Sequence, residues 1–279
     1  MQIIDGSALA KEIRTEVKKE VESLKPDGVV PGLAVVLIGD DPASHAYVKM
    51  KAKACKEVGF YSIVHEMPDS VSQEKIIETI KMMNTNPNID GILVQLPLPK
   101  HIETEKILEV IDPRKDVDGF HPYNAGRLVS GLNSYVPCTP LGVMRMFEKY
   151  GINLQGKDCV VVGASNIVGK PMAALLLNAE ATVTTCHIYT KDLKFYTQNA
   201  DIVIVGVGKA GLIGADMVKQ GAIVVDIGIN KLADGKIVGD VAFDSVSQKC
   251  SFITPVPGGV GPMTIAMLLE NTLFAAKNR

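Results

Sequence analysis

The stretch Asp158-Cys-Val-Val-Val-Gly-Ala-Ser-Asn-Ile-Val-Gly169 decides the fold, because a strand pattern changes there into a glycine loop and then into a helix pattern. After Asp158 the residues Cys159–Val162 are apolar, which predicts a strand over Asp158–Val162. The glycines delimit a loop, and the apolar residues beyond predict a helix to about Asn178. A helix is expected before this stretch, at Leu141–Tyr150, and three more strands after it, at Ala181–Cys186, Asp201–Val205 and Ala222–Ile227. This series predicts a Rossmann-like fold with the glycine loop at its first turn.

The glycine loop is a candidate cofactor site. It departs from the Gly-x-Gly-x-x-Gly fingerprint because Ser165 stands where the second glycine would be, so a purely structural turn is an alternative. Its position favours a cofactor, since a helix N-terminus offers free N–H groups to phosphate. The second strand is followed by His187-Ile-Tyr-Thr-Lys191 and lacks the acid that would hold an NAD ribose. This favours NADP and leaves NAD possible.

The first half of the chain predicts a second sheet. Ser7 is expected to cap a helix that carries one apolar stripe. Apolar strands are expected at Gly32–Ile38, near Phe60–His65 and at Ile89–Leu96, and helices at Ala43–Val58 and near Gln73–Met83. Strands that are apolar throughout and alternate with helices indicate a parallel sheet covered on both faces.

Composition excludes several classes of protein. With 279 residues, two domains are expected, and 47% hydrophobic with 22% charged residues describes a soluble globular chain. A net charge of −2 without blocks of like charge argues against nucleic acid as a partner. No apolar run approaches the roughly 20 residues of a membrane span, and the N-terminus does not read as a signal peptide. Five widely spaced cysteines fit a cytosolic protein, and the Cys and His spacings predict no metal site.

A segment rich in proline and glycine, Pro255-Val-Pro-Gly-Gly-Val-Gly-Pro-Met-Thr264, is expected to be a loop of fixed shape. Proline fixes φ, whereas glycine allows close approach of the backbone to another group. Such a loop suits a backbone that lines a ligand pocket. A tight turn between domains is the alternative.

Lys51 lies on the wrong face of the predicted helix Ala43–Val58. At 100° per residue it falls among the apolar positions, whereas Lys49, Lys53 and Lys56 point to the opposite side. A lysine among apolar groups either extends its stem to solvent or loses its proton easily. The second behaviour would make Lys51 a base near neutral pH, with Tyr47 one turn before it as a hydrogen-bond or stacking partner.

Two more polar residues interrupt apolar surroundings. Gln95 closes the apolar run Ile92-Leu-Val-Gln-Leu, where its amide needs partners. Asp118 lies in Lys115-Asp-Val-Asp-Gly119, where Asp116 and Asp118 as plain turn residues are the alternative.

Five motifs together resemble the bifunctional methylenetetrahydrofolate dehydrogenase/methenyltetrahydrofolate cyclohydrolase family, over nearly the whole chain. They are Tyr47-x-x-x-Lys51, Val94-Gln-Leu-Pro-Leu98, Lys115-Asp-Val-Asp-Gly119, Gly163-Ala-Ser-x-Ile-Val-Gly169 and Pro255–Thr264. The resemblance implies hydride transfer from 5,10-methylenetetrahydrofolate to NADP, and then hydrolysis of the methenyl product to 10-formyltetrahydrofolate in one-carbon metabolism and purine biosynthesis. It also implies an α/β fold of two domains. These are a three-layer folate-binding catalytic domain of residues 1–140 with the returning helix 265–279, and a Rossmann-like domain of residues 141–264.

The resemblance also implies roles for single residues. Lys51 would be the cyclohydrolase base or proton shuttle, Gln95 would hold it, Tyr47 would pack on the folate, and Asp118 would bind the pterin ring. The rest of the implied folate site is Ser44, Leu98, Pro257, Gly258 and Gly259. The implied cofactor site is Gly163, Ala164, Ser165, Gly169, Ile188 and Ile229.

Two departures bear on the cofactor. Many members have arginine where this chain has Ala164, and a His-Ser-Lys/Arg-Thr run where it has His187-Ile-Tyr-Thr190. Both fall where a 2′-phosphate would bind. The resemblance further implies a cytoplasmic homodimer.

Three alternatives remain open from the residues. A lyase would use Lys51 to form a Schiff base, and a sensor would bind the dinucleotide without turnover. A dehydrogenase without cyclohydrolase activity is the third, although Tyr47, Lys51, Gln95 and Asp118 argue against it.

Overall fold

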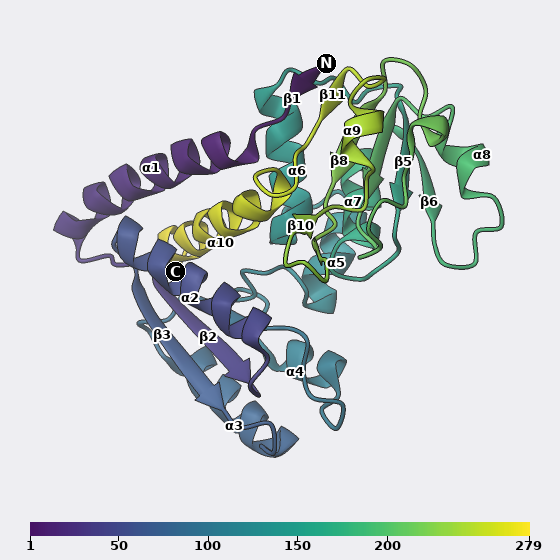
Figure 1. The fold of residues 1–279 in the computed structure, drawn as a ribbon. Coiled ribbons are helices and arrows are strands. Elements are labelled where there is room, and N and C mark those ends of the chain that lie inside the picture. The colour runs from purple at the N-terminus through teal and green to yellow at the C-terminus, as the bar shows by residue number, and fades with distance from the viewer. The chain divides into compact units, whose positions relative to one another are not determined.

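Two parallel sheets, each with its own core, organise residues 1–279, which the computed structural model describes in full (Figure 1). We call the two compact units after their sheets. The six-stranded unit comprises Met1–Ala10, Leu128–Leu132 and Thr139–Thr264. The three-stranded unit comprises Lys11–Arg127, Asn133–Cys138 and Ile265–Arg279.

The six-stranded sheet is parallel throughout and confirms the Rossmann-like prediction. Its order is β1 (Gln2–Ile3), β11 (Phe252–Ile253), β8 (Ile223–Asp226), β7 (Ile202–Val205), β5 (Asp158–Val162) and β6 (Thr182–Cys186). Since β6 pairs with one side of β5 and β7 with the other, the chain changes direction across the sheet at β5. In open parallel sheets, ligands bind beyond the carboxyl ends of the strands at such a point.

Short helices and a hairpin complete this unit. They are α6 (Cys138–Lys149), α7 (Gly169–Asn178), α8 (Leu193–Thr197), the 3₁₀ helix η2 (Ala215–Met217), α9 (Phe243–Val246), and the strands β9 (Asn230–Lys231) and β10 (Ile237–Val238). Valines of adjacent strands, such as Val160, Val203 and Val224, form one buried cluster. Because these strands are buried on both faces, they read as continuous apolar runs.

The three-stranded sheet has the order β3 (Tyr61–Met67), β2 (Gly32–Ile38) and β4 (Gly91–Val94), again parallel. Every residue of β2 is buried, and Ala34, Val36 and Ile38 pack with side chains of the helices that follow β3 and β4. The helices assigned wholly or mainly to this unit are α1 (Gly6–Leu24), η1 (Lys25–Asp27), α2 (Pro42–Val58), α3 (Gln73–Thr85), α4 (Thr104–Val110), α5 (Pro122–Val129) and α10 (Val260–Lys277). Figure 1 shows α2 beside β2 and β3, which it contacts.

Four local predictions were wrong. Asp5 caps α1, because its Oδ1 accepts the N–H of Ala8 at 2.9 Å, whereas Ser7 bonds to Gly258. The strand expected over Ile89–Leu96 is limited to β4, so Gln95 lies just beyond a strand end. The helix expected from Leu141 begins at Cys138, because Pro140 is tolerated in a first helical turn.

The fourth error concerns the proline- and glycine-rich segment. Helix α10 begins at Val260, so Val260–Thr264 are helical and the loop is limited to Pro255–Gly259. Pro262 sits in the first turn, where its missing N–H would have no intrahelical partner anyway. Residues 1–10, expected with the first domain, group with the six-stranded unit because β1 pairs with β11.

Candidate active site

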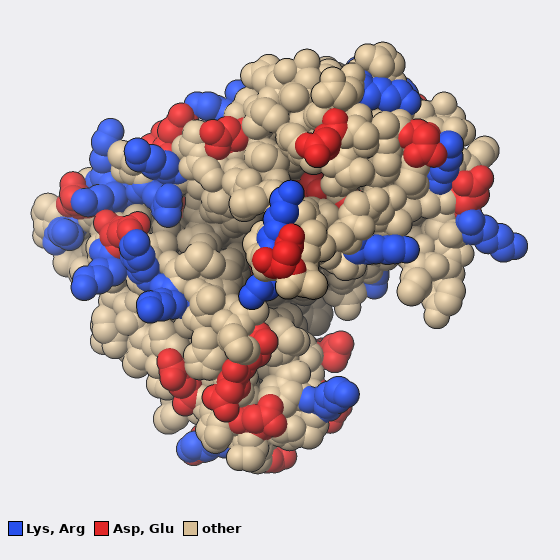
Figure 2. All heavy atoms as spheres, in the orientation of Figure 1, with Lys and Arg blue, Asp and Glu red and all other residues tan.

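Lys51 occupies the middle of the buried face of α2, as its helical position predicts. Its side chain is 5% exposed, and Val48, Ala54 and Cys55 around it are buried. Lys49, Lys53 and Lys56 are exposed, and basic side chains gather over α1 and α2 in Figure 2. The lysine therefore does not reach solvent along its stem.

Two neighbours hold the Lys51 ammonium. Its Nζ donates to Oε1 of Gln95 at 3.1 Å and lies 4.6 Å from the ring centroid of Tyr47. The amide of Gln95 is itself oriented, since its Nε2 donates to the carbonyl of Leu96 at 2.8 Å. The glutamine oxygen is thereby directed at the lysine.

Burial lowers the pKa of Lys51, and the carboxylate of Asp118 opposes this by raising it. Two thiols lie close enough to interact. Burial raises the pKa of Cys55 to about 12 and that of Cys138 well above its usual range. Both thiols are therefore neutral at pH 7, which leaves Asp118 as the charged group acting on Lys51. The arrangement favours a lysine that loses its proton more easily than an ordinary lysine does.

Asp116 and Asp118 have different surroundings. Asp116 is buried, and its carboxylate accepts the N–H groups of Phe120 and His121 and the Nδ2 of Asn124 at 3.1, 2.9 and 2.8 Å. Burial raises the pKa of Asp116 to about 6. The turn-forming alternative is therefore right for Asp116, whereas Asp118 is half-buried and acts on Lys51.

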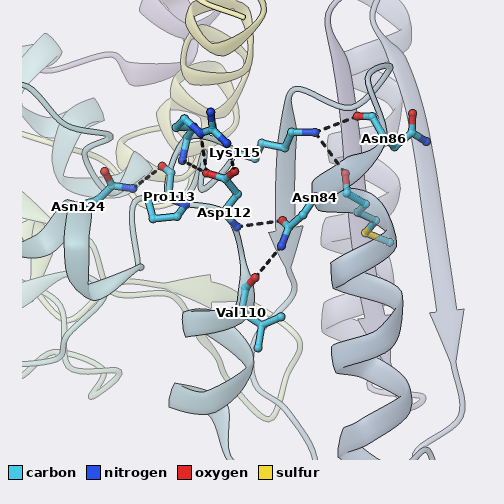
Figure 3. Close-up of polar contacts among 9 residues, drawn as sticks. Asn84, Asn86, Val110, Asp112, Pro113, Lys115 and Asn124 are labelled. Atoms are coloured by element: carbon cyan, nitrogen blue, oxygen red, sulfur yellow. Dashed lines mark hydrogen bonds and ion pairs between the residues drawn. The ribbon is translucent and has the colours of Figure 1, made fainter.

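The segment that carries Asp118 is tied to the end of α3 (Figure 3). Lys115 Nζ donates to the carbonyls of Asn86 and Met83 at 2.9 and 3.3 Å. The side chain of Asn84 accepts the N–H of Asp112 at 2.9 Å and donates to the carbonyl of Val110 at 2.7 Å. These bonds fix the backbone on the amino-terminal side of Asp118.

Asn271 of α10 fixes the same segment from its other side. Its Nδ2 donates to the carbonyls of Val117 and Val136 at 2.8 and 3.2 Å, and Cys138 Sγ lies 3.8 Å away. Asn271 was not predicted from the sequence, because Glu270 and Thr272 beside it make the amide read as part of a polar stretch of the helix.

Two other predicted folate contacts belong to the same unit. Ser44 is buried, and its N–H and hydroxyl both donate to Asp41 Oδ2 at 2.8 Å, so it stabilises the start of α2. Leu98 is half-buried against the cluster of Ala34, Val36 and Ile38. The structure thus brings Tyr47, Lys51, Gln95 and Asp118 together. The side chain of Ser44 bonds instead to Asp41 at the start of α2.

In the six-stranded unit, the loop Pro255–Gly259 is held at close range to the start of α1. Gly258 has φ +104°, and its carbonyl accepts the N–H of Ser7 at 2.9 Å. A Cβ on Gly6 would lie 1.9 Å from the carbonyl oxygen of Gly259. Pro257 is exposed, whereas Gly259 is buried. The loop therefore has the fixed shape that its composition predicts.

The glycine loop after β5 fits a dinucleotide phosphate. Gly163 has φ +124°, and a Cβ on Gly169 would lie 2.0 Å from the carbonyl oxygen of Gly163. Helix α7 therefore starts in direct contact with the loop, as close helix–strand packing requires. Ser165 Oγ accepts the N–H groups of Val168 and Gly169 at 3.2 and 3.4 Å, and Ala164 is half-buried beside it.

Exposed apolar side chains follow the strands at the same edge of this sheet. Ile188 and Tyr189, after β6, are 91% and 85% exposed, and Ile229, after β8, is 64% exposed. Apolar side chains left in water around a glycine loop suit the flat rings of a dinucleotide. The residues present therefore fit the predicted cofactor.

Other sites are not supported. No group of His, Cys, Asp and Glu side chains could hold a metal ion, and the five cysteines are buried and free. None of the helices combines the length and apolar content needed to cross a membrane. A cavity of about 530 Å³ in the three-stranded unit contains none of the predicted site residues, and its Arg114 and Arg279 bond to Asp112 and Asp90.

Comparison with known proteins identifies the class. Residues 4–118 match the model of the tetrahydrofolate dehydrogenase/cyclohydrolase catalytic domain, and residues 137–279 match that of the family's NAD(P)-binding domain. The chain therefore belongs to the tetrahydrofolate dehydrogenase/cyclohydrolase family, which confirms the resemblance.

Three relatives illustrate the similarity. The chain is 72% identical to the bifunctional protein FolD of Sulfurovum sp., covering all of both chains. It is 57% identical to the FolD methylenetetrahydrofolate dehydrogenase/cyclohydrolase of Campylobacter jejuni, with a TM-score of 0.99 over 100% of this chain and 99% of the other. It is 40% identical to the Trypanosoma brucei enzyme solved with NADP and an inhibitor, with a TM-score of 0.96 over 99% and 97% of the two chains.

Proposed function

We propose that this chain oxidises 5,10-methylenetetrahydrofolate to 5,10-methenyltetrahydrofolate with NADP, and then hydrolyses the product to 10-formyltetrahydrofolate. The family and its bifunctional relatives support both activities. The observation that carries the hydrolytic half is Lys51, buried and bonded to the uncharged amide of Gln95.

The dehydrogenase reaction depends on the relative position of folate and cofactor more than on acid–base chemistry. NADP, when bound, accepts the hydride. Backbone N–H groups of Gly163, Ala164 and Ser165 would hold its phosphates, with Gly169 allowing close approach, and Ile188 and Ile229 would pack on its rings. The protein's contribution to this step is orientation and a close approach of donor and acceptor.

Lys51 is the base of the hydrolytic half. In its neutral form it takes a proton from water as the water oxygen bonds to the methenyl carbon of the folate. The resulting ammonium returns that proton to the ring nitrogen as the carbon–nitrogen bond breaks. The remaining hydroxyl proton of the adduct leaves to solvent as the formyl C=O forms, so the overall reaction releases one proton. Gln95 accepts a hydrogen bond from either protonation state of the lysine, so it keeps Nζ in place through both steps.

The remaining folate contacts are assigned by their chemistry. Tyr47 packs against the pterin, and the Asp118 carboxylate accepts its amino and amide N–H groups. Ser44 and Leu98 belong to the same folate site. We also assign folate recognition to the backbone of Pro257, Gly258 and Gly259. In domain terms, we assign folate binding to residues 1–140 with 265–279, and cofactor binding to residues 141–264.

The cellular setting is proposed from the family resemblance. The enzyme acts in the cytoplasm as a homodimer, and its 10-formyl product serves one-carbon transfer, including purine biosynthesis. It binds neither nucleic acid nor membrane, consistent with a net charge of −2. Light scattering coupled to gel filtration measures the dimer, and a monomer at micromolar concentration would contradict it.

The first test is the initial rate of NADP reduction, and separately of NAD reduction, with 5,10-methylenetetrahydrofolate. Faster turnover with NADP is expected. Turnover mainly with NAD would overturn the cofactor assignment, and turnover with neither would overturn the function.

The second test isolates Lys51. Lys51→Met should lower the hydrolysis rate of 5,10-methenyltetrahydrofolate by at least about 100-fold, the range of general-base catalysis. Lys53→Met is the matched control, because Lys53 lies on the exposed face of α2, 3.9 Å from Glu57. Hydrolysis at the wild-type rate in Lys51→Met would remove Lys51 from the mechanism. Borohydride trapping of a carbonyl substrate on Lys51 would support the lyase alternative.

A further inference from the structure

Asp240 is a carboxylate with no exposed surface and no cationic partner among its hydrogen bonds. Its Oδ2 accepts the N–H groups of Val207 and Gly208 at 2.7 and 3.0 Å. Its Oδ1 accepts the N–H of Lys209 at 2.7 Å and the Nδ2 of Asn230 at 2.9 Å. One side chain thus binds three consecutive backbone groups of one loop and a side chain of another.

Asp226, the last residue of β8, holds the backbone of Asp240 in turn. Its Oδ1 accepts the N–H groups of Gly228 and Asp240 at 2.9 and 3.0 Å, and its Oδ2 accepts the N–H of Val241 at 2.8 Å. Burial raises the pKa of Asp226 to about 6. The position of Asp240 is therefore set from the strand end.

Two glycines make room for these carboxylates. A Cβ on Gly228 would lie 2.2 Å from Cγ of Asp240, and a Cβ on Gly239 would lie 1.9 Å from Oδ2 of Asp226. Both distances are far below any real carbon contact, so another residue type at either position would displace the carboxylate or the backbone. The sequence thus contains two acids and two glycines that depend on one another.

The two loops joined by Asp240 lie at the edge of the sheet that fits the dinucleotide. Val207–Lys209 follow β7, and Ile229 and Asn230 follow β8, the adjacent parallel strand. Val207 and Ile229 expose apolar side chains next to the backbone that Asp240 binds. A shift of either loop would therefore move an exposed apolar group at the cofactor edge.

We propose that Asp240 is a positioning residue for the dinucleotide: its carboxylate joins the loops after β7 and β8 and thereby places Val207 and Ile229 against the cofactor. The inference rests on the proposed NADP-dependent function. It assigns Asp240 no contact with the cofactor and no chemical step.

Asp240→Asn tests the proposal because it keeps the shape of the side chain and replaces one acceptor oxygen with a donor facing N–H groups. The dissociation constant of NADP, measured by calorimetry on the whole protein, should rise by about tenfold or more, as expected for lost hydrogen bonds to a charged group. The KM for the folate substrate should change by less than about twofold. Hydrogen exchange at residues 207–209 should quicken in the cofactor-free variant.

Asp244→Asn is the matched control, because Asp244 lies exposed on the neighbouring helix α9. Circular dichroism shows whether Asp240→Asn folds. If it does not, the NADP affinity of Asn230→Ala is the test instead, since this variant removes a single bond to Asp240. If the folded variant binds NADP as tightly as the wild type, the proposal is overturned. A residue that only supports the fold would lower the melting temperature of the variant and leave its NADP affinity unchanged. Absence of NADP binding by the wild-type protein would instead overturn the proposed function.

Discussion

The Nζ of Lys51 donates to the side-chain oxygen of Gln95 at 3.1 Å, and this uncharged partner leaves the lysine free to change protonation state. A carboxylate in place of the glutamine would stabilise the ammonium. Burial already disfavours the charged form of Lys51 and lowers its pKa, whereas the carboxylate of the half-buried Asp118 favours the charged form and raises that pKa. The balance of these two effects determines the pH at which the base is active.

The pH dependence of hydrolysis should therefore respond to charge around Lys51. The rate should rise with pH as Lys51 loses its proton, with a midpoint below the usual lysine pKa of 10.5. Asp118→Asn removes a negative charge and should move the midpoint to lower pH. Gln95→Glu adds one and should move it to higher pH.

Rates of methenyl hydrolysis between about pH 5 and pH 9 measure these midpoints. Each should be taken at saturating folate, so that binding defects do not enter. The same midpoint in the wild type and both variants would show that Lys51 is not the titrating group.

Stability should depend on pH through the same lysine. Since the pKa of Lys51 is lowered in the folded state, the unfolded chain binds more protons between that pKa and 10.5. The contribution of Lys51 to the free energy of unfolding should therefore rise with pH across this window in the wild type. Lys51→Met should remove that rise, which urea denaturation at neutral and alkaline pH can measure. An identical slope in both proteins would contradict the shifted pKa.

Asn271 should matter for both stability and folate binding. Asn271→Leu leaves the carbonyl of Val136 without its side-chain donor and that of Val117 with only the weak thiol donor of Cys138, which should cost about 1–3 kcal/mol of unfolding free energy. Because Val117 precedes Asp118, the KM for folate should rise as well. Asn278→Leu is the control, since Asn278 is exposed just beyond α10 and its side chain bonds only to the carbonyl of Phe274. Equal effects of the two variants would refute the special role of Asn271.

Lys191 should contribute to the choice of cofactor. It is exposed just after the turn in which His187 and Thr190 bond to each other, at the end of β6. Lys191→Ala should raise the KM for NADP several-fold more than that for NAD, because a 2′-phosphate is present only in NADP. Lys194→Ala is the control, since Lys194 pairs with Asp216 at 2.8 Å. An unchanged ratio of the two KM values would place phosphate recognition elsewhere.

Gly169 should be intolerant of substitution. The Cβ of Gly169→Ala would lie 2.0 Å from the carbonyl oxygen of Gly163, so the loop or α7 must shift. We expect NADP binding to weaken by at least about tenfold, as misplacement of a binding loop does. Gly126→Ala in α5 meets open space and should be neutral or stabilising by up to about 1 kcal/mol. Calorimetry with NADP tests both variants.

Much of the fold was predictable because its signals are local. β5 and α7 follow the predicted bounds, since a buried parallel strand reads as an apolar run and a glycine loop marks its end. Errors fell at element ends, where Asp5 and Ser7 competed for one cap and proline was tolerated in the first turns of α6 and α10. These outcomes depend on which partner is in reach, and a short window of sequence does not contain that information.

The sequence by itself determined the class of fold and the burial of Lys51, because both follow from the period of apolar residues along one element. Only the tertiary structure decided what the polar groups bond to. Gln95 reaches Lys51 across 44 positions, Asn271 reaches Val117 across 154, and Asp240 reaches Val207 across 33. A buried polar group must find a partner, but sequence spacing does not specify which one, because folding brings distant segments together to bury their apolar faces.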